Sequence, residues 1–157
     1  MAAAETESVK AGLRDALERT LADSTDRSAS HLAYSRGHAL SGVTRFEVDG
    51  SGRYQLESNE TMGREQVAYS GTLKEDERAA LLRAMLEHDL LATPSSTRNL
   101  ADDEVPVILT LRSGPLSHEL RIWDNDAREN PEFHAFETAL LALVRKLSGG
   151  AILTSPL

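Results

Sequence analysis

The stretch "VTRFEVDGSGRYQLES" (residues 43–58) decides the fold class, because one pattern of alternation runs through it on both sides of a turn. The neutral side chains are Thr44, Phe46, Val48, Tyr54 and Leu56, and charged or amide side chains lie between them on each strand. A period of two is typical of a β-strand with one buried face. The central "DGSG" provides residues that tolerate the backbone angles of a tight turn. The stretch therefore predicts an antiparallel β-hairpin with one face toward water.

Further strands are expected on both sides of this hairpin. The segment "REQVAYSGTL" (residues 64–73) places Val67 and Tyr69 on one face, and "VPVILTLRSGPLSHELRIW" (residues 105–123) predicts a second hairpin around "SGP". The segment "SHLAYSRG" (residues 30–37) is a weaker strand candidate. Together these segments predict an antiparallel sheet of about five or six strands.

Two segments change from a period of 2 to a period of 3.6, which indicates amphipathic helices. In "GTLKEDERAALLRAMLEHDLL" (residues 71–91), Thr72 and Glu75 fit a capping box. In "PEFHAFETALLALVRKL" (residues 131–147), Pro131 occupies a favoured position at a helix start. We therefore predict an α+β fold, in which helices near 74–90 and 131–147 cover one face of the sheet.

A third helix is expected near the N-terminus, because apolar residues recur at every fourth position over residues 7–22: Val9, Leu13, Leu17 and Leu21. The polar run at 23–30 separates it from the rest. This helix packs either against the main body or against another chain, which makes it a route to a homo-oligomer. The predicted organisation is a helix and linker at 1–30, one α+β domain at 31–148 and a flexible apolar tail at 149–157.

Composition excludes several classes of protein. The net charge of −8 argues against non-specific binding to nucleic acid, which depends on Lys and Arg, and against an anionic membrane surface. The absence of cysteine excludes disulfides, thiolate nucleophiles and cysteine–zinc sites, and suits a reducing cytoplasm. No apolar run approaches the roughly 20 residues of a membrane span, and the first residues do not resemble a signal peptide. With 14 Arg against 3 Lys, the sequence indicates a cytoplasmic protein of a GC-rich bacterium.

The motifs of common catalytic and metal sites are absent. In "RIWDNDARENPEFHAF" (residues 121–136), Asp124 and Asp126 alternate as in a calcium loop, but Arg128 and Glu129 occupy positions that need an oxygen ligand and a glycine. A turn followed by a helix capped by Asn130 is the better interpretation. The five histidines form no i, i+4 pair, and the acidic run at 102–104 is interpreted as a solvated loop. We expect no enzyme, no cofactor and no metal.

Two apolar features lack an obvious place in the predicted core. Trp123 has the parity of Glu119 and Arg121, which puts it on the face opposite the core. It packs under the N-terminal helix or at the rim of the sheet, or else it anchors an interface. The tail "GGAILTSPL" (residues 149–157) folds back on its own domain or docks on a partner. The candidate partner-binding residues are Trp123, Ile152, Leu153 and Leu157.

The order of elements over roughly residues 42–147 resembles the emfourin family of small bacterial protease-inhibitor proteins. The resemblance is carried by the helix in "GTLKEDERAALLRAMLEHDLLATP" (residues 71–94), the strand pair in "DDEVPVILTLRSGPLSHELRIWD" (residues 102–124) and the closing helix. The N-terminal helix lies outside it, and no inhibitory residue carries over to this sequence. The resemblance implies a protein-binding inhibitor of a metalloprotease.

The sequence therefore predicts a non-catalytic protein-binding module, such as an inhibitor, immunity or adaptor protein. Its partner is another protein, not a nucleic acid or a membrane. The alternative is a small-ligand-binding domain or an enzyme with an unrecognised site. A deep pocket holding His118 or His134 beside a carboxylate favours the alternative, whereas an exposed Trp123 or an unburied apolar tail favours the module.

Overall fold

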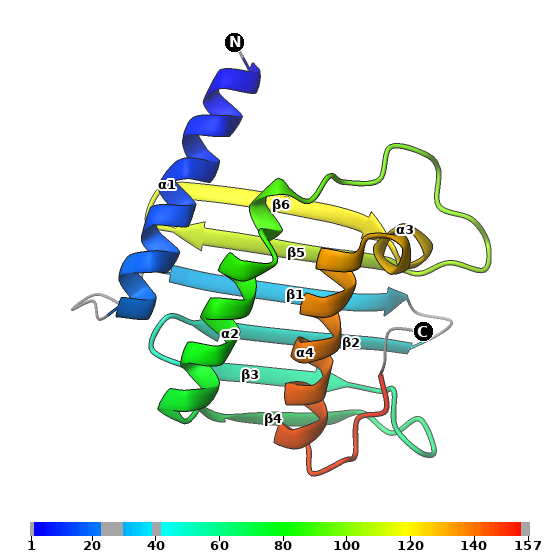
Figure 1. The fold of residues 1–157 in the computed structure, drawn as a ribbon. Helices are drawn as coiled ribbons and strands as arrows, with labels where there is room; N and C mark the ends of the chain where they lie inside the picture. The colour runs from blue at the N-terminus through cyan, green and yellow to red at the C-terminus, as the bar shows by residue number, and fades with distance from the viewer. Residues whose placement is uncertain (1, 23–29, 39–41, 155–157) are drawn as a thin grey trace.

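The computed structural model describes residues 2–22, 30–38 and 42–154 and shows an open six-stranded antiparallel sheet (Figure 1). The strand order is β4-β3-β2-β1-β5-β6. The strands are β1 (Ser30–His38), β2 (Gly42–Asp49), β3 (Arg53–Ser58), β4 (Val67–Thr72), β5 (Pro106–Ser113) and β6 (Leu116–Trp123). The predicted α+β fold with an antiparallel sheet is confirmed.

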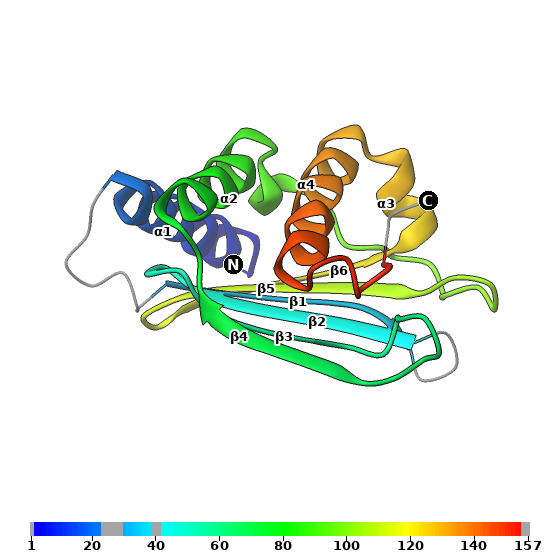
Figure 2. The same cartoon turned by 90° about the horizontal axis from the view of Figure 1, so that it is seen from below.

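The long helices lie on one face of this sheet, and Figure 2 shows the other face bare. The helices are α1 (Ala2–Ala22), α2 (Glu75–Glu87), α3 (Asp124–Glu129) and α4 (Pro131–Leu147), with a short 3₁₀ turn η2 (Leu90–Ala92). Helices α2 and α4 fulfil the prediction of two covering helices, and α1 is the additional N-terminal one. Short α3 follows β6 directly, where only a turn was expected.

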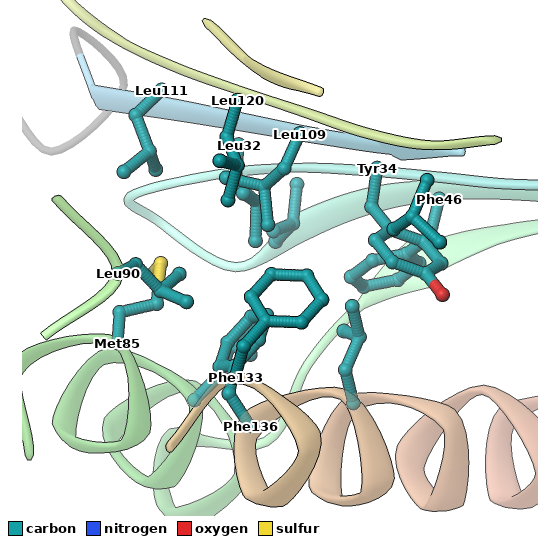
Figure 3. Close-up of a cluster of buried hydrophobic side chains, with 14 of the residues drawn as sticks. Leu32, Tyr34, Phe46, Met85, Leu90, Leu109, Leu111, Leu120, Phe133 and Phe136 are labelled. Atoms are coloured by element: carbon teal, nitrogen blue, oxygen red, sulfur yellow. The ribbon is translucent and has the colours of Figure 1, made fainter. Parts of the chain in front are cut away.

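The core lies between the sheet and these helices (Figure 3). Phe133 and Phe136 of α4 face Tyr34 and Phe46 of the sheet, and all four side chains are buried. Burying one large apolar side chain contributes about 1.5–3 kcal/mol to folding, so this layer contributes much of the stability. Aliphatic side chains from β1, β5, β6 and α2 continue the layer toward α1: Leu32, Leu109, Leu111, Leu120 and Met85.

Strand β1 is central, between β2 and β5, although its sequence was the weakest strand candidate. Leu32 and Tyr34 point into the core, as strand alternation requires. Three residues of β1 on the bare face are small: Ala33, Ser35 and Gly37. The contrast between the two faces is therefore low along β1, which explains the weak pattern.

Helix α1 packs against its own domain. Leu13 and Leu17 are buried, and the helix contacts α2, β5 and β6. The buried Arg78 of α2 donates to the carbonyl oxygens of Thr20 (2.9 Å) and Gly50 (3.3 Å), which ties the end of α1 to the turn between β2 and β3. Of the two placements considered for this helix, the structure has the intramolecular one.

Of the two predicted helix N-caps, one is wrong and one is confirmed. Helix α2 begins at Glu75, and Glu77 accepts a hydrogen bond from the Lys74 backbone N–H at 2.9 Å; the predicted Thr72 cap is wrong because Thr72 ends β4. The Asn130 cap of α4 is confirmed, since its side-chain oxygen accepts from the Phe133 N–H at 3.1 Å.

The described part of the tail folds back on the domain. Gly149 and Gly150 adopt positive φ angles of 63° and 89°, which reverse the chain after α4. Ile152 is 0% exposed and belongs to the core, and the Leu153 N–H donates to the Glu60 carbonyl oxygen at 2.8 Å. Ile152 is thus corrected from a partner contact to a core residue. Leu157 lies outside the described residues.

Candidate protein-binding face

The bare face of the sheet carries ordered rows of side chains, because antiparallel register sets them opposite one another. One row runs from Ser70 through Gln55, Glu47 and Ala33 to Thr110. The next row consists of Ala68, Glu57, Arg45, Ser35, Ile108 and Arg121. We call this surface the open face, and these rows form its centre.

The charges of the open face cancel. Its strands bring four arginines and four carboxylates to it: Arg45, Arg53, Arg112, Arg121, Glu47, Asp49, Glu57 and Glu119. Arg45 lies 3.5 Å from Glu57, and Arg121 lies 2.9 Å from Glu119. Since the whole chain carries −8, the excess negative charge lies away from this face. A partner approaching it therefore meets mixed charge instead of a repulsive field.

A shallow trough runs over β2, β3 and β4. It consists of two adjoining hollows of about 460 and 440 Å³, which share Glu47, Gln55 and Ser70 in their linings. Small side chains at Ala68 and Ser70 leave space there. Both hollows open to solvent along the strands, which suits a protein surface or an extended segment better than an enclosed small molecule.

Half-buried apolar side chains lie along one end of the open face, from β2 to β6: Val43, Ile108, Pro106 and Trp123. Trp123 pairs with Pro106 across β5 and β6, and its indole N–H donates to the Arg98 carbonyl oxygen at 2.8 Å. Parity placed Trp123 correctly on the face opposite the core. Of the two packing positions considered for it, the structure has the rim of the sheet, against the loop before β5.

That loop, residues 93–105, is held by a network that the sequence did not predict. Arg98 donates two hydrogen bonds of 2.6 Å to Glu104 and one of 3.1 Å to Asp126. The hydrogen bonds from Arg98 lower the pKa of Glu104 to about 2 and raise the pKa of Arg98. Glu104 is only 1% exposed, so the prediction of a solvated loop is wrong for this residue. The network positions the loop that supports Trp123.

A second ionic cluster lies inside the domain, under α4. Tyr34 donates to Glu137 at 2.6 Å and Arg36 donates to the same oxygen at 2.9 Å, with Asp124 at 3.7 Å from Arg36. Burial and then Glu137 raise the pKa of Tyr34. Burial would lower the pKa of Arg36, but Glu137, Tyr34 and Asp124 together raise it. Because Tyr34, Arg36 and Glu137 are all buried, the cluster fixes α4 on β1 and offers no accessible reactive group.

Two histidines, His118 and His134, lie outside the trough. His118 has a buried ring nitrogen without a hydrogen-bond partner, and burial followed by the charge of Lys10 lowers its pKa. His134 also has a buried ring nitrogen without a partner, and neither histidine lines the hollows described above. Over residues 2–22, 30–38 and 42–154, no group of three His, Asp or Glu side chains is placed to hold a metal, and no helix could cross a membrane.

The predicted partner-binding residues do not form one surface. Trp123 lies on the open face, whereas the tail follows the covered side, where Thr154 hydrogen-bonds to Thr44. Leu153 is 49% exposed beside the buried Ile152. The trough was missed, although the alternation of charged residues in residues 43–58 already marked one face as exposed.

No family model matches the chain, and no curated protein matches it significantly.

Proposed function

We propose that this protein is a non-catalytic protein-binding module, an inhibitor, immunity or adaptor protein, which binds its partner on the open face. The observation that carries the proposal is the bare, charge-balanced face in a chain of net charge −8. An adjoining trough and a half-buried tryptophan add features typical of recognition surfaces.

The partner that we propose first is a metalloprotease, because the order of elements resembles that of the emfourin inhibitors. The open face supports this through its shape: a segment of the partner can lie along the trough between the ion-paired side chains. We place the protein in the bacterial cytoplasm, on the absence of cysteine and the high ratio of arginine to lysine.

The proposal is tested by capturing the partner with the full chain, identifying it by mass spectrometry, and measuring its affinity for two charge-reversal variants. Glu47→Arg alters the trough, and Glu87→Arg alters the exposed surface of α2. Both variants change net charge equally, so they separate position from charge. We expect Glu47→Arg to weaken binding about tenfold or more, which is about 1.4 kcal/mol, and Glu87→Arg to have little effect.

If both variants weaken binding equally, or Glu87→Arg weakens it more, the partner contacts another surface and the proposal is refuted. The proposal that the protein is an inhibitor has its own test: titration of the protein against a panel of metalloproteases should reduce the activity of at least one. If none loses activity, the protein is not an inhibitor of these proteases, and the immunity and adaptor functions are the proposals that remain.

A further inference from the structure

The two edges of the sheet differ in whether their backbone groups are already bonded. At the β6 edge, the loop at residues 93–105 bonds the outward groups of Arg121 and Trp123. Ser96 N–H donates to the Arg121 carbonyl oxygen at 2.8 Å, and the Ser95 and Ser96 hydroxyls accept from the N–H groups of Arg121 and Trp123 at 3.1 and 2.9 Å. This loop therefore prevents another strand from adding to that end of β6.

Strand β4 is the other edge, and its register shows which groups point outward. The Leu73 N–H donates to the Gly52 carbonyl oxygen at 2.8 Å, so this pair is hydrogen-bonded. Hydrogen-bonded pairs alternate along an antiparallel ladder. Val67, Tyr69 and Gly71 therefore bond to β3, and the N–H and C=O groups of Ala68, Ser70 and Thr72 point away from the sheet.

These outward groups have no hydrogen-bond partner within the described part of the chain. The strand "VAYSGT" also lacks the usual protection of a sheet edge, since it contains no charged residue and no proline. Strand β6, in contrast, carries Glu119 and Arg121 as well as the loop. An uncharged, unbonded edge strand is a template for pairing with another strand.

We propose that the protein forms a symmetric dimer in which β4 pairs antiparallel with β4 of a second copy, so that one sheet runs through both molecules. A two-fold axis at Ser70 places Ser70 opposite Ser70 and Ala68 opposite Thr72, with the outward groups bonded to one another. Because the paired strands are uncharged, the register sets no charge against a like charge despite the net charge of −8 per chain.

The side chains on the covered face fit the same register. Tyr69 of one copy lies opposite Gly71 of the other, which carries no side chain of its own. In the single chain, Tyr54 already lies over this glycine: a Cβ added to Gly71 would lie 3.1 Å from the Tyr54 hydroxyl. The half-buried Tyr69 would become covered beside Tyr54, which adds apolar burial to the backbone hydrogen bonds.

The test is the mass of the full chain in solution, measured by light scattering after size-exclusion chromatography. We expect twice the chain mass of 17.1 kDa for the unaltered protein. Ser70→Lys sets two lysines opposite each other and should give the monomer mass, while Ser117→Lys on β6 should leave the dimer intact. A monomer at every concentration of the unaltered protein, or a dimer that survives Ser70→Lys, would overturn the proposal.

A cross-link reports the register directly, because the native chain contains no cysteine. Hydrogen-bonded antiparallel pairs have Cα atoms about 5.5 Å apart, within the range of a disulfide. Oxidised Ser70→Cys protein should become a covalent dimer, and Ser117→Cys should not. Efficient cross-linking at position 117 and none at 70 would place the dimer contact at the other edge. Because Ser70 also lines the trough, Glu47→Arg on β2 separates the two proposals: it should weaken partner binding and leave the dimer mass unchanged.

Discussion

Replacing Ile152 by alanine tests whether the tail belongs to the core. Ile152 is 0% exposed and packs in the hydrophobic core, and its N–H donates to the Ser148 hydroxyl at 3.1 Å. Truncating a buried isoleucine to alanine costs about 2–5 kcal/mol, depending on how far the site can collapse. A chain end collapses more readily than the middle of a helix, so we expect the lower part of that range, about 2–3 kcal/mol.

The assay is urea unfolding followed by circular dichroism, with Leu153→Ala as the matched control. Leu153 is the next residue and is 49% exposed, so its truncation should change the unfolding free energy by about 0.5 kcal/mol or less. For a chain of this size, 2–3 kcal/mol corresponds to a fall in melting temperature of roughly 4–12 °C. If Ile152→Ala leaves stability unchanged but weakens partner binding, the tail is an interface and its placement in the core is refuted.

Three further perturbations follow from named contacts. Arg98→Ala removes the hydrogen bonds that lower the pKa of Glu104 to about 2, so it should reduce the free energy of unfolding. The reduction should reach its full size above about pH 4.5, the pKa of an ordinary glutamate, and should shrink as pH falls toward 2. A reduction that does not depend on pH would exclude this ion pair as its cause. Removing residues 1–27 takes Leu13 and Leu17 from the core and should destabilise the domain by more than about 3 kcal/mol in a denaturant titration, so an unchanged midpoint would show that α1 is dispensable. Trp123→Ala should weaken partner binding by about 2 kcal/mol in calorimetry and Trp123→Phe by less, because phenylalanine keeps most of the apolar surface; equal losses would mean that the indole hydrogen bond dominates.

The strands of the sheet were predictable wherever the two faces differ strongly in polarity. Charged residues on the open face made the β2–β3 hairpin clear, and Val67 with Tyr69 marked β4. Strand β1 gave little contrast, because small residues replace charged ones on its open face. Its central position follows from pairing with both β2 and β5, which local periodicity does not encode.

The contacts that complete the candidate site depend on residues far apart in sequence or outside regular elements. Arg98 and Glu104 meet within an irregular loop, where no period relates them. Tyr34 and Glu137 are separated by more than a hundred positions. Helix α3 left a local signal, since Asp124 and Asp126 favour the positive end of a helix dipole, but its six residues are too few to show periodicity.

The most direct test of the central claim, that the open face binds a protein, is photo-cross-linking from that face in cells of the native host. A photoreactive benzoylphenylalanine at Gln55 lies in the trough, and the same residue at the exposed Arg83 of α2 probes the helical side. We predict a discrete cross-linked adduct with another protein from position 55 and none from position 83. Adducts from position 83 with none from position 55 would contradict the claim.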